Sequence, residues 1–335
     1  MNKLLITLTF ITLLISSNAS AQKDSITMYV TKALDIMKSK SVNKSKVNWE
    51  TLYSTTLNDA TKAKTIKETY PILEKALGSL NDAHSKFYPE KVVRAYTLGY
   101  KATGQEFPVI ESRLIDKKYA YISLPNIGSF NKDDWNLYIN TFYAKVNELQ
   151  KQKPKGWILD LRDNYGGMLY PMYAAVASFL DHKNVVGTKD AEGIVEYFNY
   201  KNAKFYEGQT ATQLFQLKEK QPKHIKTPIA VLVNKVTGSS AEFITAAFVG
   251  QNNVKLIGVN TQGLTSGNQE YKLPDGSFLV LTIGNIVDRN GKEYDKVGEG
   301  ISTDIRIDKT DDKTKTNESY MNKARMYIDN SRQIN

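Results

Sequence analysis

The run TGSSAEF at 237–243 contains a serine, Ser239, that could serve as a nucleophile. An apolar run rich in β-branched residues, 229–233, precedes it and has the length of a buried strand. After a small-residue turn at 237–239, apolar residues recur at helical spacing from Ser240 onward. A turn between a strand and a helix can expose a serine hydroxyl at the helix N-terminus, where developing negative charge is favoured.

The same run also fits a helix cap. Ser239 can occupy the N-cap position, and Glu242, three residues later, can reach back to the backbone of the cap. Taken alone, the run favours this cap. The nucleophile interpretation therefore depends on what the rest of the chain supplies.

Three histidines could act as a general base: His84, His182 and His224. His182 and His224 stand in polar stretches typical of the surface. His84 follows an apolar helical pattern and lies among small polar residues, in a turn that could present it to a cleft. The reference pKa of histidine, about 6.5, suits a base near neutral pH. By residue type alone, a turn histidine without a catalytic role is the simpler interpretation.

A second turn could supply oxyanion donors. The run DLRDNYGG at 160–167 follows a buried-strand pattern and precedes an apolar helical pattern. Paired glycines, Gly166 and Gly167, let the backbone turn sharply and point N–H groups at a ligand. The alternative is a tight loop in which Asp160 and Arg162 form a structural pair.

The elements that would position these residues change along the chain. Residues 22–100 carry helical apolar stripes, and strands alternate with helices between 118 and 260, which predicts α/β layers with a largely parallel sheet. The predicted helices are 26–37, 70–80, 133–150, 168–180 and, after a polar linker at 311–317, 319–328; the predicted strands are 109–114, 119–124, 156–161, 229–233, 256–259 and 278–283, with a surface hairpin in 186–206.

Composition excludes several classes of site. The 335 residues are 41% hydrophobic and 24% charged, which is typical of a soluble globular protein. There is no cysteine, so disulfides, thiolate catalysis and thiolate metal sites are excluded. We find no metal-binding or nucleotide-binding motif and predict no metal and no cofactor. The net charge is +10, but the lysines are scattered, which argues against nucleic-acid binding.

The N-terminus resembles a secretory signal peptide. Lys3 precedes an apolar run at 4–15, and small residues end at Ala21, where cleavage is expected. No later segment is long and apolar enough to span a bilayer, so we predict no membrane span in the mature chain. We expect an exported protein, periplasmic or secreted; no pattern specifies its oligomeric state.

Together, these motifs resemble the tail-specific, or C-terminal processing, serine peptidases and the related tricorn core protease. DLRDNYGG resembles that family's strand-and-glycine motif, and VLVNKVTGSSAEF resembles its nucleophile motif. The runs IGVNTQG at 257–263, LPDGS at 273–277, Leu281-Thr282 and GISTDI at 300–305 continue in the family's order. The resemblance covers roughly 105–310. It implies a ClpP/crotonase-like layered α/β core with a mostly parallel sheet flanked by helices, preceded by an N-terminal helical segment.

The resemblance implies an acyl-enzyme serine peptidase acting on a peptide or protein. Ser239 falls on the nucleophile, and the backbone of Ser240 and of Gly166 or Gly167 falls on the oxyanion donors. Family members with a Ser–Lys dyad carry lysine directly after the Thr-x-Gly, where this chain has Leu264.

The base must therefore come from elsewhere. The run LGSLNDAH at 77–84 resembles the tricorn-type segment that supplies a catalytic histidine, which implies His84. Glu299 is the candidate for the acid that orients His84, with Asp295 as the alternative. Candidate substrate-lining residues are Asn164, Thr265, Ser266, Asn268 and Gln269.

We expect a signal peptide at 1–21, a helical cap segment at 22–104, a catalytic core at 105–310, and a linker with a final helix at 311–335. Many relatives insert a PDZ domain before the core. Only about 20–30 residues separate His84 from the first predicted core strand, too few for such a domain. Preference for C-terminal tails is therefore open. The alternative function is a catalytically inactive module that binds peptides or apolar ligands on the same fold.

Overall fold

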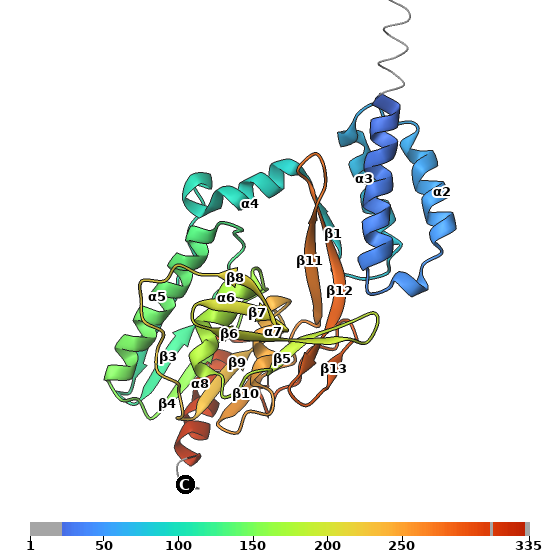
Figure 1. Cartoon of the computed structure of the whole chain (residues 1–335). Helices are drawn as coiled ribbons and strands as arrows, with labels where there is room; N and C mark the ends of the chain where they lie inside the picture. The colour runs from blue at the N-terminus through green and yellow to red at the C-terminus, as the bar shows by residue number, and fades with distance from the viewer. Residues whose placement is uncertain (1–21, 309–310, 332–335) are drawn as a thin grey trace, which may run out of the picture. The chain divides into compact units, whose positions relative to one another are not determined.

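The computed structural model describes residues 22–308 and 311–331, and the predicted signal peptide with its cleavage site lies outside them. The chain forms two compact units (Figure 1). The first comprises the described part of Met1–Arg94 together with Asn268–Ile283. The second comprises Ala95–Gly267 and the described part of Gly284–Asn335. Each unit is described by itself below.

Helices and a hairpin build the first unit. Residues 22–40 are helical, followed by α2 (Trp49–Ala60) and α3 (Tyr70–Gly78). Two helices predicted in this region are confirmed, whereas α2 was not predicted as a separate element. Short 3₁₀ turns lie at Lys44–Lys46 and Ile66–Thr69; β1 (Lys86–Tyr88) pairs antiparallel with the start of β12 (Phe278–Asp288), and β11 (Ser266–Lys272) pairs with β12.

A shared apolar core joins the hairpin to these helices. Leu34 and Leu73 of the helices are buried in one cluster with Leu273, Leu279 and Leu281 of the β11–β12 segment. The helical stripes therefore pack onto a hairpin that comes about 200 residues or more later in the chain. The unit is held together by contacts that are distant in sequence.

A six-stranded sheet forms the centre of the second unit. Its strand order is β14-β10-β9-β4-β3-β2, and every neighbouring pair is parallel except β2 with β3. The strands are β2 (Ser112–Ile115), β3 (Tyr119–Ser123), β4 (Gly156–Asp160), β9 (Ile229–Val233), β10 (Val254–Gly258) and β14 (Ile305–Arg306).

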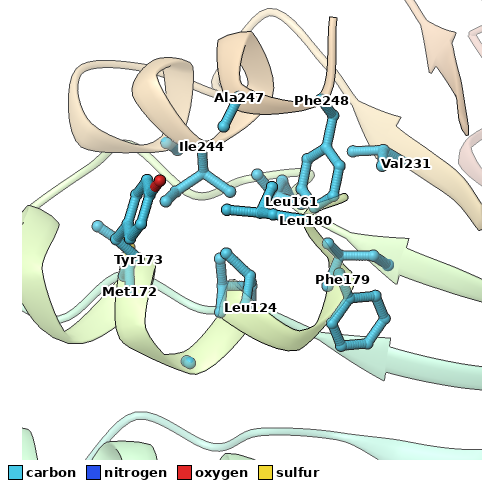
Figure 2. Close-up of a cluster of buried hydrophobic side chains, with 14 of the residues drawn as sticks. Leu124, Leu161, Met172, Tyr173, Phe179, Leu180, Val231, Ile244, Ala247 and Phe248 are labelled. Carbon is cyan, nitrogen blue, oxygen red and sulfur yellow. The ribbon is translucent and has the colours of Figure 1, made fainter. Parts of the chain in front are cut away.

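Apolar residues cover both faces of this sheet. In β9, Val231 packs into the core shown in Figure 2, beside residues of α6 and α7, while Leu232 packs on the opposite side with Ile328 of α8. Burial on both faces explains why β9 is a continuous apolar run rather than an alternating one. The helices are α5 (Lys132–Lys151), α6 (Leu169–Val176) with a 3₁₀ turn at Ala177–Phe179, α7 (Ser240–Phe248) and α8 (Lys313–Asn330).

A second set of strands is antiparallel. The end of β12 pairs with β5 and β13, and β5 leads through β6 and β7 to β8. The predicted α/β fold is confirmed, but a mostly parallel arrangement holds for the six-stranded sheet and not for these strands. They are β5 (Val186–Asp190), β6 (Val195–Lys201), β7 (Lys204–Glu207), β8 (Thr210–Leu214) and β13 (Glu293–Tyr294).

The final helix begins earlier than the apolar pattern indicates. Its N-cap is Asp312, whose Oδ1 accepts hydrogen bonds from the N–H groups of Thr314 and Lys315 at 2.8 and 3.2 Å. This cap starts α8 at Lys313 rather than at the predicted residue 319. Among the described helices, none combines the length and the apolar character that crossing a membrane requires.

Candidate active site

The turn between β9 and α7 holds Ser239 in an unusual backbone conformation. Its φ is 53° and its ψ is −122°, in a region that residues with a side chain rarely adopt. Ser239 is half-buried and occupies the N-cap of α7. Such a sharp strand-to-helix turn is the geometry that presents a nucleophilic hydroxyl. The predicted strand, turn and helix are therefore present, and the catalytic role of Ser239 stays a prediction.

Close packing of glycines surrounds this elbow. A Cβ atom on Gly166 would lie 2.7 Å from the Cβ of Ser239 and 2.9 Å from the carbonyl oxygen of Gly238. A Cβ atom on Gly238 would overlap the side chain of Gln262. Only glycine fits at either position without displacing its neighbours. The DLRDNYGG turn and the Ser239 turn thus lie in direct contact.

The two turns are also joined by hydrogen bonds. The buried side chain of Asn164 accepts a hydrogen bond from the N–H of Gly166 at 2.9 Å and donates one to the carbonyl of Leu124 at 2.7 Å. The backbone carbonyl of Asn164 accepts from the N–H of Gly238 at 3.0 Å. The Ser240 hydroxyl donates to the carbonyl of Gly167 at 2.6 Å. Asn164, predicted to line the substrate, therefore has its side chain bonded within the turn.

The backbone N–H groups near Ser239 differ in whether they already have a hydrogen-bond acceptor. The N–H of Gly166 donates to the side-chain oxygen of Asn164. Residues 22–308 and 311–331 provide no hydrogen-bond acceptor for the N–H of Gly167. Ser240 is the first residue of α7, so the helix itself cannot pair its N–H. Both glycines have positive φ, 107° and 115°.

Glu242 does more than cap α7. Its carboxylate is fully buried and accepts four hydrogen bonds. Oε2 accepts from the N–H groups of Ser239 (3.0 Å) and Leu264 (2.8 Å), and Oε1 accepts from the Thr261 hydroxyl (2.5 Å) and the N–H of Gly263 (2.7 Å). Burial raises the pKa of the Glu242 carboxyl, and these hydrogen bonds oppose the rise. The predicted cap is confirmed, and it also ties the 261–264 turn to the elbow.

A lysine lies at the 261–264 turn although Leu264 replaces the dyad lysine. The ammonium of Lys235 donates to the carbonyls of Thr261 (2.9 Å), Gln262 (3.2 Å) and Gly298 (3.1 Å). An ammonium has three protons, and here three carbonyls accept them. Lys235 therefore joins these loops by three hydrogen bonds. The sequence motifs did not single it out.

His84 lies in the first unit, in a turn held by Asp82. Asp82 Oδ1 accepts from the N–H of His84 at 3.0 Å and from the hydroxyl of Thr282 at 3.0 Å, while Oδ2 accepts from the Ser85 hydroxyl at 2.8 Å. Asn268, predicted to line the substrate, donates to the carbonyl of His84 at 3.5 Å. The backbone of the His84 turn is thus fixed from β11 and β12.

The remaining predicted residues are distributed as follows. Glu299 belongs to the second unit, is largely exposed and lies 3.8 Å from the ammonium of Lys296. Thr265 is buried, and its hydroxyl donates to the carbonyl of Tyr294 at 2.8 Å. Ser266 begins β11. His182, His224, Gln269 and Asp295 are exposed. Across the described ranges, no group of three or more His, Asp or Glu side chains could hold a metal ion.

Comparison with known proteins adds a family. The sequence model of peptidase family S41 matches residues 118–307, more than half of the chain. The chain is 29% identical over 248 residues to a nisin-resistance protein of Lactococcus lactis subsp. lactis, covering 73% of each chain. It is 29% identical over 154 residues to the carboxy-terminal processing protease CtpA of Bacillus subtilis, covering 46% of this chain and 29% of that protein.

Solved structures support the fold. A lipoprotein from Streptococcus agalactiae matches with a TM-score of 0.71 at 24% identity, over 89% of this chain and 96% of that one. The photosystem II D1 C-terminal processing protease matches with a TM-score of 0.61 at 17% identity, over 85% and 93%. At such identities the likeness concerns the fold, and the family comes from the sequence match. The chain belongs to peptidase family S41 and is a serine-type peptidase.

Proposed function

We propose that the protein hydrolyses peptide bonds through an acyl-enzyme formed on Ser239. The observation that carries this proposal is the strained elbow of Ser239, packed directly against Gly166. In the first step Ser239 Oγ bonds to the peptide carbonyl carbon and its proton passes to His84. The C–N bond then breaks, and the same proton goes to the leaving amine. Water, deprotonated by His84, releases the acyl group.

The N–H groups of Ser240 and Gly167 stabilise the oxyanion in this proposal. Gly166 is the weaker candidate because its N–H is donated to Asn164. Its role is to leave room for the elbow, since any side chain there would meet Ser239. Donors fixed before the reaction are effective because they need not reorient as charge develops.

His84 is the proposed base because the alternatives near the elbow are unsuitable. Leu264 cannot take a proton, and the Lys235 ammonium is bonded to three carbonyls. The His84 turn, in contrast, is fixed by Asp82 and Asn268. We retain Glu299 as the proposed orienting acid and Asp295 as its alternative.

The proposed substrate is a peptide or protein, met after export to the periplasm or the medium and after signal cleavage near Ala21. The match to a nisin-resistance protein over 73% of both chains makes nisin a defined peptide to test first. In the sequence, helix α4 (Glu90–Thr103) takes up most of the stretch between His84 and the start of β2. Recognition of C-terminal tails would therefore need contacts other than those of a PDZ domain.

A fluorophosphonate probe tests the nucleophile. The probe should label the wild type and not the Ser239→Ala variant, and hydrolysis of peptides should be lost with the label. The matched control is Ser39→Ala, which removes an exposed serine of the first unit and should label normally. Labelling that survives Ser239→Ala would refute the assignment of the nucleophile.

A further inference from the structure

Tyr165 is exposed beside the proposed oxyanion turn. It directly precedes Gly166, and 62% of its surface is accessible, whereas Asn164 before it is only 1% accessible. Exposed aromatic residues are individually common and need no explanation. This one directly precedes the glycine that packs against Ser239, which makes it a candidate to contact a bound peptide.

Helix α4 contributes further exposed apolar side chains. Tyr96 is 38% and Leu98 is 49% accessible. The helix is interrupted at Gly99, with φ 82° and ψ 177°. A Cβ atom on Gly99 would lie 2.5 Å from Asp134 Oδ2 and 2.9 Å from the Cβ of Asn131. The glycine therefore allows α4 to approach the start of α5 closely.

Hydrogen bonds fix this part of α4 to the loop before α5. The N–H of Phe130 donates to the carbonyl of Tyr96 at 3.0 Å, and the N–H of Tyr100 donates to Asp134 Oδ2 at 3.1 Å. The N–H of Gly128 donates to the hydroxyl of Tyr100 at 2.9 Å. These bonds hold Tyr96 and Tyr100 in place against residues 128–134.

The same loop touches the oxyanion turn. Ile127 and Gly167 form a parallel β-bridge, and the N–H of Met168 donates to the carbonyl of Ile127 at 2.7 Å. A Cβ atom on Gly128, the residue after Ile127, would lie 3.8 Å from the Tyr96 ring, so this half-exposed ring lies against the same loop. A continuous series of contacts thus links α4 through Ile127 to the turn beside Ser239.

We propose that Tyr165, together with Tyr96 and Leu98, receives a bulky apolar side chain of the substrate beside the scissile bond. This inference rests on the proposed function, because these residues can select a substrate side chain only if Ser239 attacks the peptide. Aromatic rings offer a large apolar contact at low cost in side-chain entropy. A leucine or phenylalanine side chain would therefore bind there better than alanine.

The test begins with the cleavage sites of the wild type in a defined peptide mixture, identified by mass spectrometry. Leu, Ile, Phe and Tyr should be enriched next to the cleaved bonds. A quenched peptide with leucine at the preferred position is then compared with its alanine counterpart. Tyr165→Ala should lower kcat/KM about tenfold for the leucine peptide and less than about twofold for the alanine peptide.

Several variants make the outcome decisive. Tyr165→Phe should keep the preference, and Leu98→Ala should weaken it and serves as the test if Tyr165→Ala does not fold. The matched control is Met326→Ala. Met326 is an apolar residue of α8 that is 56% accessible, close to the 62% of Tyr165. Its neighbour in α8, Ile328, packs against Gly156 at the start of β4, whereas Tyr165 follows the end of that strand. Equal losses on both peptides, or no apolar enrichment in the wild type, would overturn the proposal. Fluorophosphonate labelling separates failure of this proposal from failure of the proposed function. If the wild type is not labelled, the proposed function is refuted; if it is labelled but shows no apolar preference, only the present proposal is refuted.

Discussion

The turn of Ser239 and the turn of His84 are held by different means. Glycine contacts and the buried carboxylate of Glu242 hold the first, in a strained backbone conformation. The second is held by Asp82, a partly exposed side chain that bonds to backbone and hydroxyl groups. The Ser239 turn thus depends on close packing and a buried carboxylate, whereas the His84 turn depends on hydrogen bonds that water can partly replace.

The largest effect should follow from removing the proposed base. His84→Ala should lower kcat by about 10³-fold, within the range that general acid–base groups contribute, without a comparable loss of stability. The control is His182→Ala, which removes an exposed histidine and should leave kcat unchanged. Full peptidase activity in His84→Ala would show that His84 is not the base, and the two turns would then not share the catalytic work.

A second prediction compares the two carboxylates. Glu242→Ala leaves four donors around Ser239 and the 261–264 turn without an acceptor, so the free energy of unfolding should fall by about 3 kcal/mol or more. Asp82→Ala removes a partly exposed acceptor and should cost about 1–2 kcal/mol. Urea unfolding of both variants measures the difference. Equal losses would show that the two turns depend on their carboxylates alike.

A third prediction isolates shape from backbone strain. Gly166→Ala and Gly193→Ala both place a side chain at positive φ, 107° and 82°. Only a Cβ on Gly166 would contact Ser239, at 2.7 Å, whereas the nearest atom to a Cβ on Gly193 is 3.9 Å away. Fluorophosphonate labelling should therefore slow about 100-fold in Gly166→Ala, comparable to losing an oxyanion donor, and stay normal in Gly193→Ala. Similar rates in both variants would show that packing against Gly166 is unimportant.

The smallest effect concerns Lys235. Lys235→Met removes three hydrogen bonds between loops, but the side chain is exposed, so the expected cost is about 1 kcal/mol with a few-fold loss in kcat/KM. Lys226→Met, at another exposed lysine, should change neither quantity. Loss of all activity in Lys235→Met, with the fold intact, would give this lysine a chemical role that its three acceptors argue against.

The strands buried on both faces were the most predictable part of the fold. The apolar run at 229–233 coincides with β9, because burial on both sides leaves an unbroken apolar pattern. The surface hairpin predicted in 186–206 is present, because β6 pairs antiparallel with β5 and with β7, whereas β8, which is mostly polar, was not predicted. The start of α8 was predicted too late, because the polar first turn after the Asp312 cap contributes nothing to an apolar pattern.

The site was predictable only as far as its motifs were local. The Ser239 elbow follows from a strand, a turn and a helix that are adjacent in sequence. The second role of Glu242 and the position of Lys235 depend on residues 261–264, which the fold brings in from the end of β10. No spacing rule connects these segments. His84 and Glu299 belong to different units, and their pairing stays a prediction.

The β11–β12 hairpin has a consequence for anyone who shortens this chain. Residues 268–283 lie inside the segment that matches family S41, yet they belong to the first unit. Their leucines, at 273, 279 and 281, are buried with apolar residues of the N-terminal helices. A truncated protein that starts at residue 95 would expose these leucines to water and to other chains, which favours aggregation. We therefore expect that the family-matched segment does not fold on its own and that its solubility depends on the N-terminal helices.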